Sequence, residues 1–246
     1  FDAGRKNEPV RSEYPEMLPW DLRETCVREK QALGFYVSAH PLDRYGRELE
    51  RFQLTSAGEL AGMDNWAKVR VAGMVEGYRE KIFKGNGGSG GGKIAFFELE
   101  DQSGRVTVRV KENQIDNAAP TLTSGDPVVV SGALRFQERS DDEEGDSGPR
   151  EPTLLLDKVE TLSSLLQSET RSVVIRLKAK ETSTEEVRRL GTVLRELPGT
   201  CGVSLVFEMP AGAEVHLSLP DLRVEPGDRL LASLERQFGR QVAELR

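Results

Sequence analysis

The chain has 246 residues, enough for two or three domains that each bury a core of their own. Its 34 Lys and Arg against 41 Asp and Glu give a net charge of -7, which excludes a protein that coats nucleic acid over its whole surface and leaves only a local basic patch. Two distant cysteines, Cys26 and Cys201, exclude a disulfide framework, and there is no signal peptide or apolar run long enough to span a membrane. These features favour a cytoplasmic protein.

Residues 1–20 are polar, with three prolines and little periodicity, which predicts a flexible linker. Residues 21–66 predict a short helical segment. Asp21 can cap its first helix and Gly34 can end it, because apolar residues return between them at helical spacing. Two more helices are expected after the break at Pro41.

Residues 67–163 change to the alternation that is typical of β-strands. The stretch from Asp101 to Gly104 has the composition of a tight turn and predicts a hairpin. Three strands, a helix and two strands is the element order of a five-stranded Greek-key barrel of the OB type, a fold that binds nucleic acid. The expected strands cover residues 68–78, 93–100, 105–110, 127–134 and 153–161, with the helix at 112–119.

Residues 168–246 predict a separate small α+β domain. Ser183 and Glu186 can form a capping box that opens one helix, and Gly239 can end another. Strands are expected at residues 171–177, 203–207, 214–219, 222–224 and 241–245. The fold class is therefore multi-domain, β plus α+β, with a short helical N-terminal segment, a five-stranded OB-fold barrel and a small C-terminal α+β domain.

The loop predicted between the first two barrel strands, residues 79–93, is basic in an acidic chain. Its glycines let it fit a ligand, and its cations can neutralise phosphates. OB barrels bind oligonucleotides with this loop. The alternative is a solvated loop whose lysines only aid solubility. Against the single Glu80, the loop carries Arg79, Lys81, Lys84 and Lys93.

Two aromatic residues on the second strand, Phe96 and Phe97, are adjacent and must point to opposite faces. The outward ring could stack a base, or could pack against a neighbouring domain. On the third strand, Arg105 and Arg109 could extend the track of phosphate contacts, or could be ordinary surface residues.

The loop predicted between the last two barrel strands, residues 137–151, has seven acidic residues against Arg139 and Arg150. This charge should repel DNA. We expect a disordered acidic insertion that directs the ligand towards the basic loop.

No catalytic or metal site is predicted. Neither His40 nor His216 has a nucleophile or carboxylate at a useful spacing. No pair of carboxylates follows a strand where two metal ions could drive nucleotidyl transfer. Residues 87–93 fit G-x-x-x-x-G-K, but Ile94 stands where a P-loop needs Ser or Thr.

The stretch LGFYVSAHPL, residues 33–42, resembles a signature of bacterial replicative DNA polymerase III alpha subunits. The stretch KIAFFELEDQSG, residues 93–104, resembles the second and third strands of the OB domain in that family, and the last domain resembles its C-terminal domain. The first residue, Phe1, looks like the last aromatic of the sliding-clamp-binding peptide that precedes this region in the family.

This resemblance implies a non-catalytic C-terminal part of a magnesium-using DNA polymerase whose catalytic carboxylates lie upstream. It implies an OB domain that binds single-stranded template DNA and a C-terminal domain that contacts the tau subunit of the clamp loader. It also implies a replisome protein of the cytoplasm that associates with the nucleoid, with no cofactor in this segment.

Two other functions stay open. Anticodon-binding OB domains of aminoacyl-tRNA synthetases have a similar G-K-x-x-F-x-x-L-x-D-x-S-G pattern, so the barrel could bind tRNA. It could also serve only in assembly, packing against protein.

Overall fold

The computed structural model describes residues 20, 22–83, 91–136, 151–210 and 212–246. The chain divides into two compact units, residues 1–40 and 41–246. In the first unit α1 (Leu22–Leu33) ends at Gly34, whose N–H donates to the Lys30 carbonyl at 3.0 Å, as the sequence predicted. The linker predicted at 1–20 lies, apart from Trp20, outside the described residues.

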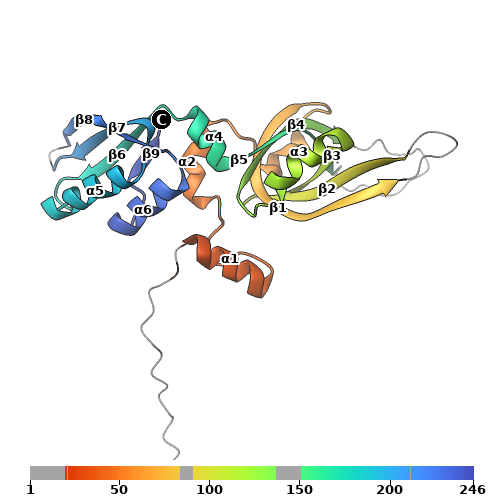
Figure 1. Ribbon diagram of the computed structural model, residues 1–246, viewed down its shortest axis with the longest axis horizontal. Coiled ribbons are helices and arrows are strands. Elements are labelled where there is room, and N and C mark those ends of the chain that lie inside the picture. The colour runs from red at the N-terminus through yellow and green to blue at the C-terminus, as the bar shows by residue number, and fades with distance from the viewer. Residues whose placement is uncertain (1–19, 21, 84–90, 137–150, 211) are drawn as a thin grey trace, which may run out of the picture. The chain divides into compact units, whose positions relative to one another are not determined.

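The second unit contains a closed five-stranded barrel in the order β1-β2-β3-β5-β4, drawn from orange to green in Figure 1. β3 and β5 are parallel, and the other neighbouring pairs are antiparallel. This confirms the predicted OB-type barrel. Its elements are β1 (Lys68–Phe83), β2 (Gly92–Glu100), β3 (Arg105–Lys111), α3 (Glu112–Leu122), β4 (Val128–Phe136) and β5 (Pro152–Thr161).

Alternation along the strands builds the barrel core. On β3 the side chains of Val106, Val108 and Val110 are at most 2% exposed, while the residues between them face outward. The predicted hairpin between β2 and β3 is present. The Asp101 carboxylate accepts from the N–H groups of Ser103 at 2.7 Å and Gly104 at 2.9 Å, which fixes the turn.

The rest of the second unit is a four-stranded sheet in the order β8-β7-β6-β9. Two helices, α5 (Thr184–Glu196) and α6 (Asp228–Phe238), lie on one face of it in Figure 1, and the capping box at Ser183 is present. One continuous β8 replaces the two strands predicted at 214–219 and 222–224. Helix α4 (Leu162–Glu169), between the barrel and this sheet in the chain, was not predicted. The strands of the sheet are β6 (Ser172–Lys178), β7 (Pro198–Glu208), β8 (Glu214–Val224) and β9 (Ala243–Leu245).

Residues that precede the barrel complete the core of this sheet. Leu42, Tyr45 and Phe52 are buried in one cluster with the leucines of α5 and α6. Arg44, 8% exposed, forms an ion pair with Glu235 at 3.0 Å. The elements before the barrel are η1 (Asp43–Tyr45), α2 (Gly46–Arg51) and η2 (Ala57–Gly62), where η marks a 3-10 helix.

Candidate nucleic-acid interface

The outer face of β1, β2 and β3 carries side chains in rows that run across the strands. In one row Arg79 pairs with Phe96, and Phe96 pairs with Arg109. In the next row Lys81 pairs with Ile94, which pairs with Lys111. Directly opposed residues have their side chains on the same face. Two cations therefore flank Phe96 in one row, and two more flank Ile94 in the next row. We call these two rows the cationic rows.

A β-bulge in β1 creates this alignment. The register shifts between Glu76 and Arg79, where Gly77 has a φ of +62°. Two residues of β1 thus oppose one of β2, as in bulges that place a glycine in the left-handed region. If β1 kept all its residues but paired regularly beyond Glu76, Tyr78 would oppose Phe96 and Arg79 would oppose Ala95 of the inner face.

The cations of these rows are available to a ligand. Arg79, Lys81, Arg109 and Lys111 are exposed, and none of them forms an ion pair with another described residue. The Lys81 ammonium lies 5.9 Å from the centroid of the Phe96 ring. A cation beside a half-buried ring offers phosphate neutralisation and base stacking at one place.

The same face turns acidic towards the β2–β3 hairpin. Glu76 and Glu98 form the next row, and Glu98 accepts a hydrogen bond from Thr107 at 2.9 Å. Arg105, a predicted contact, lies one row further on and pairs with Glu100 at 3.0 Å, and this hydrogen bond raises the pKa of Arg105. Arg105 therefore does not belong with the four available cations.

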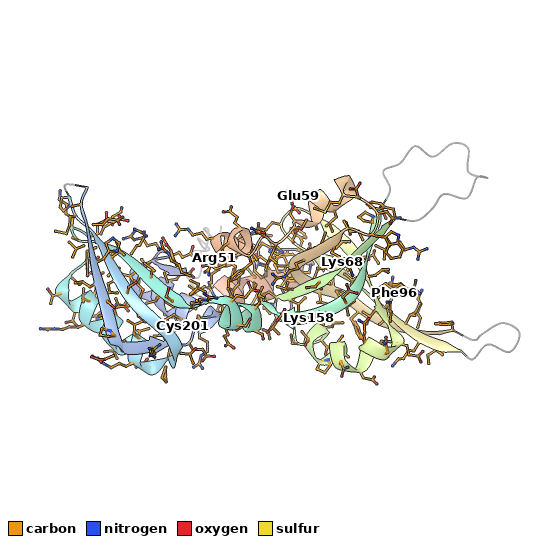
Figure 2. The ribbon with its side chains drawn as sticks, turned by 90° about the horizontal axis from the view of Figure 1, so that it is seen from above. Arg51, Glu59, Lys68, Phe96, Lys158 and Cys201 are labelled. Atoms are coloured by element: carbon orange, nitrogen blue, oxygen red, sulfur yellow. The ribbon has the colours of Figure 1, made fainter. Side chains whose placement is uncertain are left out.

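The two adjacent phenylalanines have different environments. Phe97 is 2% exposed and belongs to the barrel core, so its prediction as a binding residue was wrong. Phe96 is partly exposed on the outer face; Figure 2 labels it on the barrel. Phe96 is therefore the ring that can stack a base.

The segment predicted as a basic loop is largely a two-stranded ribbon, because β1 runs to Phe83 and β2 starts at Gly92. Lys93 lies on the ribbon face opposite to Phe96. Its ammonium forms an ion pair with the Glu80 carboxylate at 2.5 Å. The Lys93 ammonium lowers the pKa of Glu80. Burial, together with the hydrogen bond that the Tyr78 hydroxyl donates to Glu80, raises the pKa of Tyr78 to about 12. Lys93 is therefore engaged within the protein.

Some predicted features lie outside the described residues: Lys84, Phe1 and the acidic stretch 137–150. Lys111 was missed because the third strand was predicted to end at Val110. The alternation in RVTVRVK, residues 105–111, gave the signal, since it places Lys111 on the face of Arg109.

Other kinds of site find no support in the described part of the chain. No group of three His, Cys, Asp or Glu side chains within those ranges could hold a metal ion. Of the helices described, none combines the length and apolar composition that crossing a membrane requires. Within the described ranges, the exposed cations and the Phe96 ring of the cationic rows fit a ligand that carries phosphates and bases.

Comparison with known proteins adds to this geometry. Residues 69–162 match the tRNA anti-codon family, described as an OB-fold nucleic acid binding domain. The DNA polymerase III subunit alpha of Pseudomonas fluorescens is 27% identical over 219 residues, which are 89% of this chain and 17% of that protein. The same subunit of Neisseria meningitidis serogroup B is 30% identical over 234 residues, 94% of this chain and 19% of that protein.

Among solved structures, asparaginyl-tRNA synthetase from Pyrococcus horikoshii is similar with a TM-score of 0.33 and 21% identity, over 45% of this chain and 23% of that one. The chain spans only 17% and 19% of the length of the two polymerase subunits. Along nearly its whole length, the chain is therefore a relative of the C-terminal part of bacterial DNA polymerase III alpha subunits, with an OB-fold nucleic-acid-binding domain at residues 69–162.

Proposed function

We propose that the chain is the non-catalytic C-terminal part of a DNA polymerase III alpha subunit and that its barrel binds single-stranded template DNA during replication. The cationic rows around Phe96 carry this proposal, because they lie on an outer face that OB barrels use for oligonucleotides. The parent protein is then a DNA-directed DNA polymerase of the cytoplasm, associated with the nucleoid. Its magnesium-binding carboxylates belong to a part outside this segment.

The face favours binding that tolerates any sequence. Its cations neutralise phosphates and its ring stacks any base, so affinity comes from the backbone and from base planes. If all four cations contact phosphates, the logarithm of the binding constant falls with the logarithm of salt concentration at a slope of about -2.8, at roughly -0.7 per contact.

Residues 168–246 are proposed to contact the tau subunit of the clamp loader, and a peptide ending at Phe1 is proposed to bind the sliding clamp. The support for both partners is the resemblance of the chain to the polymerase family. We also propose a division into a linker at 1–20, a helical segment at 21–66 and the OB domain at 67–163.

Binding of fluorescein-labelled oligo-dT, followed by anisotropy at rising salt, tests the DNA function. We expect affinity to fall steeply with salt and to be lost in the combined variant Lys81→Glu, Arg109→Glu and Lys111→Glu. The matched control reverses three exposed cations, one in the turn after β6 and two on α5: Lys180→Glu, Arg188→Glu and Arg195→Glu. Absent binding at low salt, or binding that ignores salt and the barrel variant, would leave the barrel with an assembly role.

A tRNA-binding barrel is the second candidate, since the matching family carries the name of the tRNA anticodon. Competition decides between the two. We expect unlabelled oligo-dT to displace the labelled strand at lower concentration than an anticodon stem-loop does; the reverse order would favour tRNA.

A further inference from the structure

Trp66 is an exposed aromatic residue in an unfavourable backbone conformation. It precedes β1 with a φ of +69°, and 55% of its surface is exposed. Large side chains rarely adopt a positive φ, and such strain persists where the surrounding structure holds it and is concentrated at functional sites. Exposed indole and backbone strain at one residue therefore call for a functional explanation.

Hydrogen bonds to β4 hold Trp66 in this conformation. Its N–H donates to the Leu134 carbonyl at 2.8 Å, and the Leu134 N–H donates to the Ala67 carbonyl at 2.9 Å. These bonds extend the β1–β4 ladder beyond its last pair and place Trp66 beside Arg135. The Arg135 guanidinium lies 5.5 Å from the centroid of the indole ring.

Arg135 lies on the same outer surface as the cationic rows. Its neighbours in sequence, Leu134 and Phe136, face the core, so Arg135 points outward. Arg135 pairs with Thr153 of β5, which pairs with Thr107 of β3, one row from Arg109 and Phe96. Across the outer surface from β2 over β3 and β5 to β4 there are three β-strand spacings, about 14 Å. This distance leaves room for several nucleotides of single-stranded nucleic acid.

Arg135 is also free to bind an anion, because it forms no ion pair with any described residue. An aromatic plane with an unpaired guanidinium beside it matches a nucleotide, which offers a base to stack and a phosphate to neutralise.

We propose that Trp66 and Arg135 form a second nucleotide-binding station on the barrel, where the indole stacks a base and the guanidinium binds the adjacent phosphate. The proposal rests on the proposed function, because the ligand is the same single strand that lies over Phe96 and Arg109. It extends the DNA path around the barrel from β2 across β3 and β5 to β4.

Tryptophan emission tests the station directly. The chain has two tryptophans, so the full chain with Trp20→Phe reports Trp66 alone. We expect oligo-dT to quench this emission, with the same midpoint that anisotropy of the labelled strand gives. A base stacked on an indole is worth roughly 5-fold to 150-fold in affinity, so Trp66→Gly should weaken binding by that range while Trp66→Phe retains most of it.

Glycine adopts a positive φ freely, so Trp66→Gly should melt at or above the temperature of the parent. A variant that binds less tightly without losing stability excludes a merely structural role for the ring. If anisotropy shows binding while the Trp66 emission stays constant, the station does not exist and the proposed function stands. If anisotropy shows no binding, the proposed function fails and the station fails with it.

Discussion

Phe96 and Phe97 are adjacent on β2, and the pleat of the strand gives them different roles. Phe97 packs in the barrel core, whereas Phe96 lies between Arg79 and Arg109 on the outer face. Sequence alone could state that the two rings point to opposite sides but not which ring is which, because strong coiling of a strand can shift which of its residues face inward.

Truncation of each ring should separate binding from stability. Phe96→Ala is expected to weaken oligo-dT binding by about 1–3 kcal/mol with little change in unfolding, because a partly exposed ring is lost. Phe97→Ala is expected to cost about 3–5 kcal/mol of folding free energy, because it empties the core. Anisotropy and urea unfolding measure the two quantities, and equal stability losses in both variants would contradict the assignment.

Glu48 makes stability depend on pH. It is 2% exposed, and burial raises the pKa of its carboxyl, although the backbone N–H groups of Glu48 and Leu245 oppose the shift. Its Oε2 has no hydrogen-bond partner among the described residues. The folded state therefore binds a proton on the Glu48 carboxyl more tightly than the unfolded chain does. Protonation of Glu48 contributes its full stabilisation of the fold below the unfolded pKa of about 4.3, and this contribution is lost as pH rises through the folded pKa.

Glu48→Gln should therefore be more stable than the parent at pH 8, with a difference that shrinks towards pH 4. Urea unfolding at pH 4, 6 and 8 measures it. Glu50→Gln, exposed on the same helix, is the matched control and should show no such trend. A constant or reversed difference for Glu48→Gln would show that burial does not set this pKa.

At the scale of elements, local patterns predicted most of the fold. Strict alternation in RVTVRVK identified β3, and the Ser183 capping box placed the start of α5. The end of β1 was missed because Gly77 interrupts the alternation and the strand resumes beyond the bulge. α4 was missed because it is only 8 residues long and follows β5 directly.

The bulge itself can be tested by comparing two changes at one position. Gly77→Val disfavours the positive φ, so β1 should return to regular pairing, which removes Arg79 from the row of Phe96 and weakens oligo-dT binding. Deleting Gly77 removes the extra residue and leaves Arg79 opposite Phe96, so binding should be retained. Anisotropy titration of both variants checks this, and the opposite order of affinities would contradict it.

At the scale of the whole molecule, the sheet core is built from chain on both sides of the barrel. Leu42, Tyr45 and Phe52 precede it, and the leucines of α5 and α6 follow it. No local sequence pattern could show this, because such packing depends on contacts between residues far apart in the chain. The C-terminal part was accordingly expected to be a separate domain.

Arg44 links these two parts of the chain. Its side chain is 6% exposed and pairs with Glu235 and Asp228, which are about a quarter exposed. Arg44→Ala should lower the free energy of unfolding by about 2–3 kcal/mol, because it leaves two carboxylates poorly solvated. Arg47→Ala is the control, because Arg47 is 63% exposed and forms only a surface ion pair with Glu244. In urea unfolding, Arg47→Ala should lower the free energy of unfolding by less than about 1 kcal/mol. Equal losses for Arg44→Ala and Arg47→Ala would contradict the linking role of Arg44.

The contribution of residues 42–52 to the sheet core decides where the polypeptide can be divided for expression. A fragment starting after the barrel would expose apolar side chains that Leu42 and Phe52 normally cover, and would be prone to aggregate. A more promising design keeps both stretches and joins Leu54 to Leu162 by a short glycine-serine bridge. Such a chain would report on protein partners without any contribution from nucleic acid.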